Sequence, residues 1–424
     1  MSVANRRVVL TGIGVVTPIG LDAGSFWTAL SQGQTGIKRI GGFDPSPLQT
    51  QIAAEIIGFD IKKYLLTREE RKQIRVMSRT IQLAVAAANL AIADGKVEKD
   101  KLDRTRFGVE FGAGLIPSEL DELGIASQTG TESNIHATDP KIWGEKSIGQ
   151  IQPLWMLKYL PNMLACHVSI LHDAQGPNNT ITESDVASLL AVGEACRIIQ
   201  RNQADFFLAG GGDSKLTPLS MVRQSLFGHM SRCNETPQKA VKPFDKRRDG
   251  TVFGEGGCVL VVEELEHAKK RGASIYAEVA GFGSAFDRGL TGKGLGRAIR
   301  AALAEAKISP ADVDHVNTHG LGSVPLDAFE ARGIHEVFGT SVPVWSITPN
   351  IGHLSAGSGT TDLAASLLAM KHGTLPPTLN YETPDPACPV QVLREARPIA
   401  KPYFVKIGYT EMGQCGAMVC RRWE

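Results

Sequence analysis

The chain has 424 residues, and its 45 Lys and Arg nearly balance its 44 Asp and Glu, which leaves a formal net charge of +1. That balance excludes the strongly basic composition with which proteins bind nucleic acid through charge alone. The length exceeds the size at which one hydrophobic core usually stops growing, so we expect two core units or one duplicated architecture. The 7 cysteines are scattered without a Cys-x-x-Cys pair, which argues against a structural zinc site or a disulfide framework.

The first predicted element follows the N-terminus directly. Residues 6–16 (RRVVLTGIGVV) have the pattern of a strand, with no apolar leader before them and no apolar stretch of membrane-spanning length after them. We therefore expect a cytoplasmic protein without a membrane span.

Strand patterns and helix patterns then alternate along the chain. A strand-like run at 204–213 precedes a helix near Met221, and a second run at 313–320 precedes a helix at 326–339. This alternation indicates an α/β fold. The last run, 403–423, holds two apolar stretches around a glycine-containing turn, which predicts a closing hairpin whose turn carries functional residues.

A faint repeat suggests two similar halves. The strand pattern with Gly-x-Gly at 8–16 recurs at Tyr276–Phe286. We place the halves at residues 1–270 and 271–424. They should pack as one rigid body, because no low-complexity linker separates them.

Two glycine-rich pieces, 209–215 and 291–297, look at first like phosphate-binding loops. In such a loop the Gly-Lys pair is followed by Ser or Thr, whereas Lys293 is followed by Gly294. We interpret both pieces as turn and close-packing glycines.

Longer blocks carry a specific resemblance. They are Val241–Gly283 and Val316–Gly320, together with FWTALSQGQTGI, LAGGGDSKLTPL, NIGHLSAGSG and REARPIA in order along the chain. In these blocks the chain resembles β-ketoacyl-acyl-carrier-protein synthase II and its relatives, over nearly its whole length. The resemblance implies a thiolase fold, which is an α/β/α/β/α sandwich of two pseudo-duplicated halves, and a dimer. It also implies an active site at the foot of a phosphopantetheine tunnel, with no metal and no cofactor of its own, since phosphopantetheine arrives on the carrier protein.

The nucleophile of that family is a cysteine at a helix N-terminus, where the helix dipole and the backbone N–H groups favour a thiolate. When Gly176-Pro177 and Gly193 are used as anchors, Asp185 falls where this cysteine belongs. Cys166 lies well upstream, and Cys196 lies about three helical turns downstream. The resemblance therefore implies a divergent member that lacks its nucleophile.

Two histidines of the family, which bind the malonyl thioester and stabilise the enolate left by decarboxylation, match His319 and His353. The alternative is that both are ordinary buried histidines. Asp327 and Glu330 match acidic family positions, and in a purely structural interpretation they would cap or pair on the helix that holds them.

Other positions depart from the family. The lysine before the second histidine is replaced by Thr348, so we expect its ammonium to be missing. In the stretch that binds the pantetheine arm only Ser323 keeps a hydroxyl. The closing loop Thr410–Cys415 places Glu411 and Met412 where the family has an apolar gate. We expect substrate contacts from Ser323, Thr348, Glu411 and Met412.

One segment could dock a carrier protein. The run TREERKQIR contains Arg68, Arg71, Lys72 and Arg75, which match a basic family segment and would attract an acidic carrier. The alternative is a solvated helix face neutralised by its own glutamates.

Two hypotheses follow. The first is a non-condensing subunit, similar to a chain-length factor, that binds the acyl carrier protein and dimerises with itself or with a cysteine-bearing ketosynthase through the strand at 176–182. The second is an altered acyl-thioester enzyme. Its simplest form is a malonyl-carrier decarboxylase that uses His319 and His353, with Asp185 as proton donor or orienting group.

Overall fold

The computed structural model describes residues 6–132, 135–227 and 229–424. Its main strands form one sheet in the order β12-β10-β9-β14-β15-β8-β1-β7-β6-β4-β5. The strands in chain order are β1 (Val8–Val16), β4 (Phe107–Gly112), β5 (Asn178–Ile181), β6 (Phe206–Ser214), β7 (Glu255–Glu264), β8 (Ala277–Phe286), β9 (Val313–Asn317), β10 (Pro343–Trp345), β12 (Gln391–Val392), β14 (Tyr403–Tyr409) and β15 (Gln414–Arg422). Two small sheets pair β2 (Ile37–Arg39) with β3 (Ile52–Ala54) and β11 (Thr374–Leu375) with β13 (Arg397–Pro398).

Helices cover and separate the two parts of this sheet. They are α1 (Ala23–Ser31), α2 (Arg68–Lys72), α3 (Arg79–Asp94), α4 (Leu120–Gly130), α5 (Pro140–Ile142), α6 (Met163–His172), α7 (Ala187–Gln200), α8 (Pro218–Ser225), α9 (Leu265–Lys270), α10 (Lys293–Ala306), α11 (Val324–Phe338), α12 (Thr348–Ile351) and α13 (Ser358–His372). The predicted helices near Met221 and at 326–339 are confirmed as α8 and α11.

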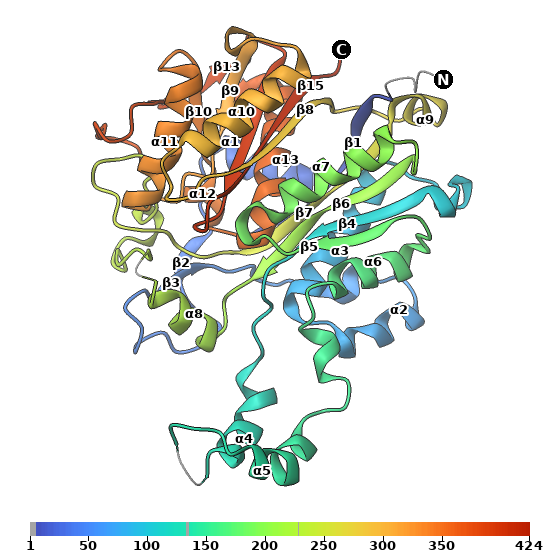
Figure 1. Cartoon of the computed structure of the whole chain (residues 1–424), viewed down its shortest axis with the longest axis vertical. Helices are drawn as coiled ribbons and strands as arrows, with labels where there is room; N and C mark the ends of the chain where they lie inside the picture. Colours follow the sequence, from blue (N-terminus) through green and yellow to red (C-terminus); the bar gives the residue numbers. More distant parts are fainter. Residues whose placement is uncertain (1–5, 133–134, 228) are drawn as a thin grey trace.

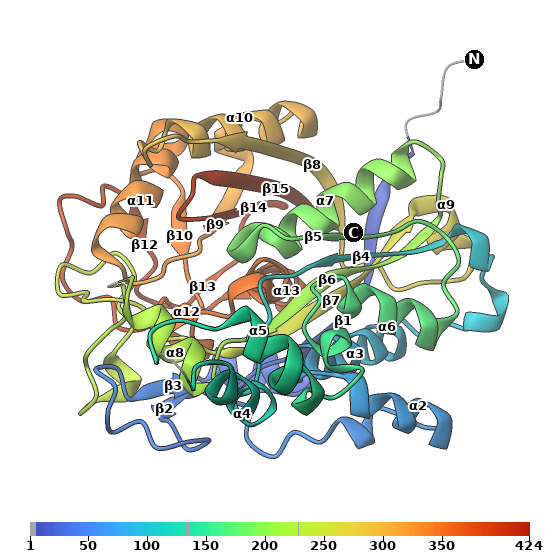
Figure 2. The ribbon, with the colours of Figure 1, turned by 60° about the horizontal axis from the view of Figure 1, so that its bottom comes forward.

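The layers follow from which helix packs on which strands. Helices α3 and α6 cover β1, β7, β6 and β4 on one outer face, and α10 covers β8 and β15 on the other, with α11 packed against α10. Helices α7 and α13 lie between the two strand groups, as Figure 2 shows, and α13 is buried from Ser358 to Met370. This is the predicted five-layered α/β/α/β/α sandwich of the thiolase fold.

The repeated Gly-x-Gly pairs explain how closely the outer helices approach. A Cβ on Gly14 of β1 would lie 1.8 Å from the carbonyl oxygen of Ala87 in α3. A Cβ on Gly283 of β8 would lie 2.1 Å from the carbonyl oxygen of Ala298 in α10. Each strand therefore needs glycine at the same relative place, so that a helix backbone can rest on it.

The two strand groups meet along a short seam. Val8–Leu10 of β1 pair antiparallel with Ala277–Val279 of β8, and beyond these residues the strands diverge around the central helices. The predicted closing hairpin is confirmed as β14 and β15, which pair from Tyr403↔Arg421 to Tyr409↔Cys415.

The segment between β4 and α6 carries α4 and α5 on an arm that projects from the sandwich, at the bottom of Figure 1. Large apolar side chains are exposed on this arm, among them Leu120, Ile125, Leu154 and Met156. Within the described ranges, no helix combines the length and the apolar composition needed to cross a bilayer.

Candidate functional site

Asp185 lies on a tight turn between the edge strand β5 and helix α7. The turn is a short 3₁₀ segment, Ser184–Val186, and Ser184 has φ of 44°, a left-handed conformation that is rare for residues with a side chain. Ser184 Oγ donates to Asp185 Oδ1 at 3.2 Å. The strained turn holds the carboxylate at the start of α7, where the sequence predicted it.

The two predicted histidines lie beside this carboxylate. His353 follows α12, and its Nε2 is 3.1 Å from Asp185 Oδ1. The ring of His319, which follows β9, meets the ring of His353 edge to face with centroids 5.1 Å apart. Ligand-capable atoms of all three side chains lie within 4.8 Å of one another. Residues separated by up to 168 positions thus form one cluster, as the family resemblance implies.

Both histidines present polar atoms that find no hydrogen-bond partner in the described part of the chain. These atoms are Nε2 of His319 and both ring nitrogens of His353. The Asp185–His353 contact is therefore an ion pair at close distance without the alignment of a hydrogen bond. His319 and His353 are 2% and 5% exposed, so water contributes little to satisfying these atoms.

Charge in the cluster is concentrated on Asp185 and His353. Burial disfavours a charged carboxylate, but the facing His353 imidazolium outweighs burial and lowers the pKa of Asp185 to about 2. Burial likewise opposes a charged His353, and Asp185 outweighs it and raises the pKa of His353. Burial and the neighbouring charge of His353 hold the pKa of His319 well below its ordinary value, which leaves that ring neutral.

Aromatic side chains that the sequence analysis missed form the walls of the cluster. Tyr409, the last residue of β14, meets His319 edge to face with ring centroids 5.3 Å apart. Phe253 lies against His353 with centroids 5.0 Å apart. The sequence placed the gate within Thr410–Cys415, whereas the structure places an aromatic ring at the end of β14, one residue before that loop.

The acidic residues of α11 hold the loop that carries His319. Glu330 accepts hydrogen bonds from the backbone N–H of His319 at 2.6 Å and of Gly320 at 2.9 Å. Asp327 accepts from the N–H of Gly322 at 3.0 Å and of Phe244 at 2.8 Å. Burial raises the pKa of Asp327 to about 7 and that of Glu330 to about 8. These two carboxyl groups therefore fix the loop before α11, and whether they also support catalysis remains a prediction.

The lysine that Thr348 replaces is absent, but another buried ammonium lies near the site. Lys406 on β14 is buried and pairs with Asp362 of α13 at 2.6 Å, and its charge also acts on Glu330 and His319. Thr348 instead donates from Oγ1 to the carbonyl oxygen of His319 at 2.6 Å. Lys406 lies on a different strand from the replaced family lysine. Comparison of the sequence around Thr348 with the family motif could therefore not reveal it.

A cavity of about 20 Å³ borders His353. Its walls include the predicted Ser323 and Glu411, and also His229, Phe227 and Gln224, which sequence reasoning missed. Ser323 Oγ lies 3.4 Å from Nδ1 of His229, and Nε2 of His229 lies 4.0 Å from Glu411. This volume holds about one water molecule.

Two of the residues expected to touch substrate do not line this cavity. Met412 lies at the tip of the β14–β15 turn and is 81% exposed, because the turn carries it out of the hairpin core. Thr348 is committed to the His319 backbone, as described above. The substrate contacts of Thr348 and Met412, like those of Ser323 and Glu411, remain predictions.

The basic segment forms α2 and the turn after it, and all four of its predicted residues are exposed. Arg71 donates to the carbonyl oxygens of Leu65 and Lys62, and Lys72 pairs with Glu69 at 2.7 Å. Arg68 and Arg75 have no ion-pair partner among the residues described. These two arginines therefore offer free positive charge to a partner.

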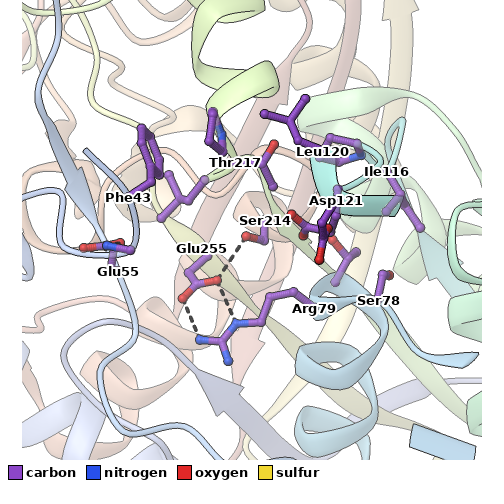
Figure 3. A pocket seen from close by; sticks show the side chains of 16 residues that line it. Phe43, Glu55, Ser78, Arg79, Ile116, Leu120, Asp121, Ser214, Thr217 and Glu255 are labelled. Carbon is purple, nitrogen blue, oxygen red and sulfur yellow. Dashed lines mark hydrogen bonds and ion pairs between the residues drawn. The ribbon is translucent and has the colours of Figure 1, made fainter. Parts of the chain in front are cut away.

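A larger pocket of about 560 Å³ lies elsewhere, and Asp185, His319 and His353 are not among its lining residues. Figure 3 shows Arg79 paired with Glu255 in its floor, at 2.7 and 3.0 Å, with Ser214 Oγ donating to the same carboxylate. The pocket therefore contains a satisfied structural ion pair rather than the chemistry expected from the sequence.

Every cysteine of the chain lies in the described ranges, and none lines the cavity at His353. Cys415 pairs opposite Tyr409 in the hairpin, but burial raises the pKa of its thiol to about 12. Burial does the same to Cys196. Neither thiol has the depressed pKa of a nucleophile.

Comparisons with known proteins agree with this geometry. The β-ketoacyl synthase N-terminal domain matches residues 5–268, and the C-terminal domain of the same family matches residues 276–382. A protein named as a polyketide β-ketoacyl synthase in Streptomyces halstedii is 38% identical over 93% of this chain and 92% of its own length. The 3-oxoacyl-[acyl-carrier-protein] synthase 2 of Coxiella burnetii is 35% identical over 98% of this chain and 99% of its own.

Two solved structures have the same fold as this chain. The ishigamide ketosynthase/chain length factor superposes with a TM-score of 0.86 at 26% identity, covering 99% of this chain and 100% of that chain. A type II polyketide ketosynthase, AntDE, in complex with its acyl carrier protein AntF superposes with a TM-score of 0.83 at 27% identity, with the same coverage.

Proposed function

The chain belongs to the β-ketoacyl synthase family, and from this premise we propose that it is a non-condensing subunit, similar to a chain-length factor, of fatty-acid or polyketide synthesis. In this role it binds an acyl carrier protein and pairs with a cysteine-bearing ketosynthase. The partner carries the growing chain, and this subunit contributes shape to the shared substrate tunnel.

The observation that carries the proposal is the carboxylate of Asp185 at the nucleophile position. A carboxylate is a poor acyl acceptor compared with a thiolate, and its acylation gives a labile anhydride in place of a thioester. The ion pair with His353 also ties up the carboxylate and holds it ionised. No thiol near the site has the pKa needed to replace it.

The size of the cavity supports the same role. About 20 Å³ beside His353 admits a water molecule but no phosphopantetheine thioester. Entry of a thioester requires the walls at 224–227 and at Glu411 to move. A subunit that shapes a tunnel without loading a chain needs no such opening.

The exposed edge of the sheet is the surface that suits a partner. Strand β5 pairs with β4 on one side only, and Asn178 and Asn179 are exposed. An edge strand presents unpaired N–H and C=O groups that a second chain can join. This edge leads directly into the turn of Asp185, so a partner strand here would set the site of one subunit beside the site of the other.

A second function, malonyl-carrier decarboxylation, is favoured by the two histidines. Nε2 of His319 is buried without a hydrogen-bond partner among the described residues, and Nε2 of His353 close by faces only Asp185, which suits the two rings to donate to a thioester carbonyl as it becomes an enolate. Asp185 would then orient His353. This function requires turnover by the chain alone, without a ketosynthase partner.

One assay separates the two functions. The chain is incubated with malonyl-carrier protein, alone and with a cysteine-bearing ketosynthase from the same genome, and carrier-bound products are followed by mass spectrometry. We expect the chain alone to leave malonyl-carrier unchanged, and we expect it to co-purify with the ketosynthase and alter the length of its product. Acetyl-carrier formed by the chain alone establishes decarboxylation, and acyl-enzyme formed on the chain contradicts both functions.

A thiol-directed trap tests the site assignment. Cerulenin should leave the chain unmodified, because no cysteine occupies the nucleophile position. The cysteine-bearing ketosynthase serves as the positive control under the same conditions. A stoichiometric adduct on Cys415 would mean that the hairpin opens and that the nucleophile has been wrongly placed.

A further inference from the structure

We propose that Asp185, His319 and His353 form a binding site for a divalent transition-metal ion. The substitution that removes the thiol leaves two imidazoles and one carboxylate facing one another, and this donor set is common to zinc and non-haem iron proteins. The inference concerns these side chains alone and does not depend on the function proposed above.

The distances suit one small cation. Bonds of about 2.0–2.1 Å from zinc to nitrogen or oxygen place neighbouring ligand atoms roughly 3.3 Å apart. Asp185 Oδ1 and His353 Nε2 are already 3.1 Å apart, and ligand atoms of all three residues lie within 4.8 Å of one another. The remaining separations between ligand atoms, up to 4.8 Å, must shorten when the ion binds.

Unsatisfied buried nitrogens are the second observation. Nε2 of His319 and Nε2 of His353 lack hydrogen-bond partners within the described chain, and both rings are more than nine-tenths buried. Leaving such atoms unpaired costs stability. A cation between the rings and Asp185 would replace the proton of the His353 imidazolium, which leaves to solvent, and would then be held by both nitrogens and the carboxylate.

The donor set selects the class of ion. Magnesium and calcium prefer oxygen ligands, whereas imidazole nitrogen suits Zn²⁺, Co²⁺ and Fe²⁺. Three protein ligands leave at least one position open, on the side of the cavity that His353 borders. Nδ1 of His353 has no acceptor among the described groups, and second-shell partners of this kind are typically worth about 10–100-fold in affinity. We therefore expect binding weaker than that of structural zinc sites.

The test uses Co²⁺ as a spectroscopic probe on the full chain, with the visible ligand-field bands followed during titration. We expect one equivalent to bind, and we expect Asp185→Asn, His319→Ala and His353→Ala each to weaken binding at least tenfold. His335→Ala, a change of an exposed histidine on α11 that contacts Pro389, is the matched control and should bind as the parent does. Mg²⁺ should not compete.

Zinc X-ray absorption on the parent chain keeps the test independent of how the variants fold. Two imidazole scatterers in the first coordination sphere would agree with the site, and thiolate scatterers or a single imidazole would overturn it. Absence of Co²⁺ bands up to millimolar metal would also overturn it, as would unchanged binding in any of the three ligand variants that retain the circular dichroism of the parent.

Discussion

The two central helices begin in the same way and with opposite consequences. Helix α7 follows the 3₁₀ turn Ser184–Val186, and α13 follows the 3₁₀ turn Ser355–Gly357. In each turn the serine has a left-handed backbone, with φ of 44° and 48°. The next residue is Asp185 in the first half and Ala356 in the second.

The left-handed serine is common to both turns, whereas the ionisable residue after it is present in only one. Both halves keep the strained turn, and the two turns pack against each other in the middle layer. Only one of them carries a charge, and that charge lies 3.1 Å from His353, which comes from the second half of the chain. Strain is therefore a property of the duplicated scaffold, whereas the ionisable group belongs to the site.

Removal of the histidine should have the largest effect on stability. In His353→Ala the Asp185 carboxylate stays buried without its partner, and breaking a buried pair in this way typically costs about 3–5 kcal/mol. Urea unfolding measures the change. The double variant Asp185→Ala/His353→Ala is the control and should recover part of the loss. A loss of less than about 1 kcal/mol in the single variant would mean that the pair is not what makes a carboxylate tolerable in this turn.

A carboxylate in the other turn should be nearly as costly. Ala356 is fully buried, and the Asp213 carboxylate in this region is already paired with Lys215 at 3.0 Å. Ala356→Asp would therefore bury a new carboxylate that has no histidine partner of its own, and we expect a loss of roughly 3 kcal/mol in urea unfolding. Ala356→Ser serves as the control for size. Wild-type stability in Ala356→Asp would show that the turn itself, and not its histidine partner, accommodates a carboxylate.

The pH dependence of the pair sharpens the same comparison. The raised pKa of His353 gives stability that is present below about pH 6.5 and lost as pH rises through the folded pKa. The lowered pKa of Asp185, about 2, gives stability that is present above about pH 4 and lost only as pH falls towards 2. The parent should thus exceed Asp185→Asn most between about pH 4 and 6.5, by about 1–2 kcal/mol. Urea midpoints from pH 4.5 to 9 measure this, and a difference independent of pH would contradict the pairing.

The sequence predicted the parts of this site that lie in contiguous motifs. Asp185, His319 and His353 each lie in a matched block, the alternation of strands and helices indicates an α/β fold, and the thiolase fold is what the family resemblance implies. Tyr409 and Lys406 were missed because their roles depend on which strands neighbour β14 in the folded sheet. The glycine pair on β8 was visible as a repeat, but its reason, the approach of α10, required the structure.

An exposed charge should matter less than a buried one, and α2 offers the contrast. We expect Arg68→Glu combined with Arg75→Glu to weaken binding of an acidic carrier protein about fivefold to tenfold at low salt, since both arginines are free of ion pairs. Arg71→Gln combined with Lys72→Gln is the matched control, because those two side chains are already engaged. Calorimetric titration at low and physiological salt measures the effect. Equal weakening by both double variants would place docking elsewhere.

The smallest effect is expected from the change that restores the family residue in the first turn. In Asp185→Cys the thiol would gain the N-terminus of α7, which favours a thiolate. It would still lie buried, and burial raises the pKa of a thiol. Tyr409 and Lys406, which are unchanged in this variant, do not lower the pKa of the new thiol. Tyr409 packs against His319, and Lys406 is paired with Asp362.

The cavity decides the outcome of Asp185→Cys. About 20 Å³ at His353 cannot take the acyl-pantetheine that a cysteine would need to attack, and Leu321 in its wall cannot donate a hydrogen bond to the arm. Residues that act as a unit lose function non-additively, so repair of one member should recover little. A condensation assay with acyl- and malonyl-carrier proteins should therefore stay near background for the single variant, and rise only when Glu411→Phe and Leu321→Thr are added. Turnover of about one to a thousand per second from Asp185→Cys alone would mean that the pocket opens freely and that the missing thiol is the only barrier to condensation.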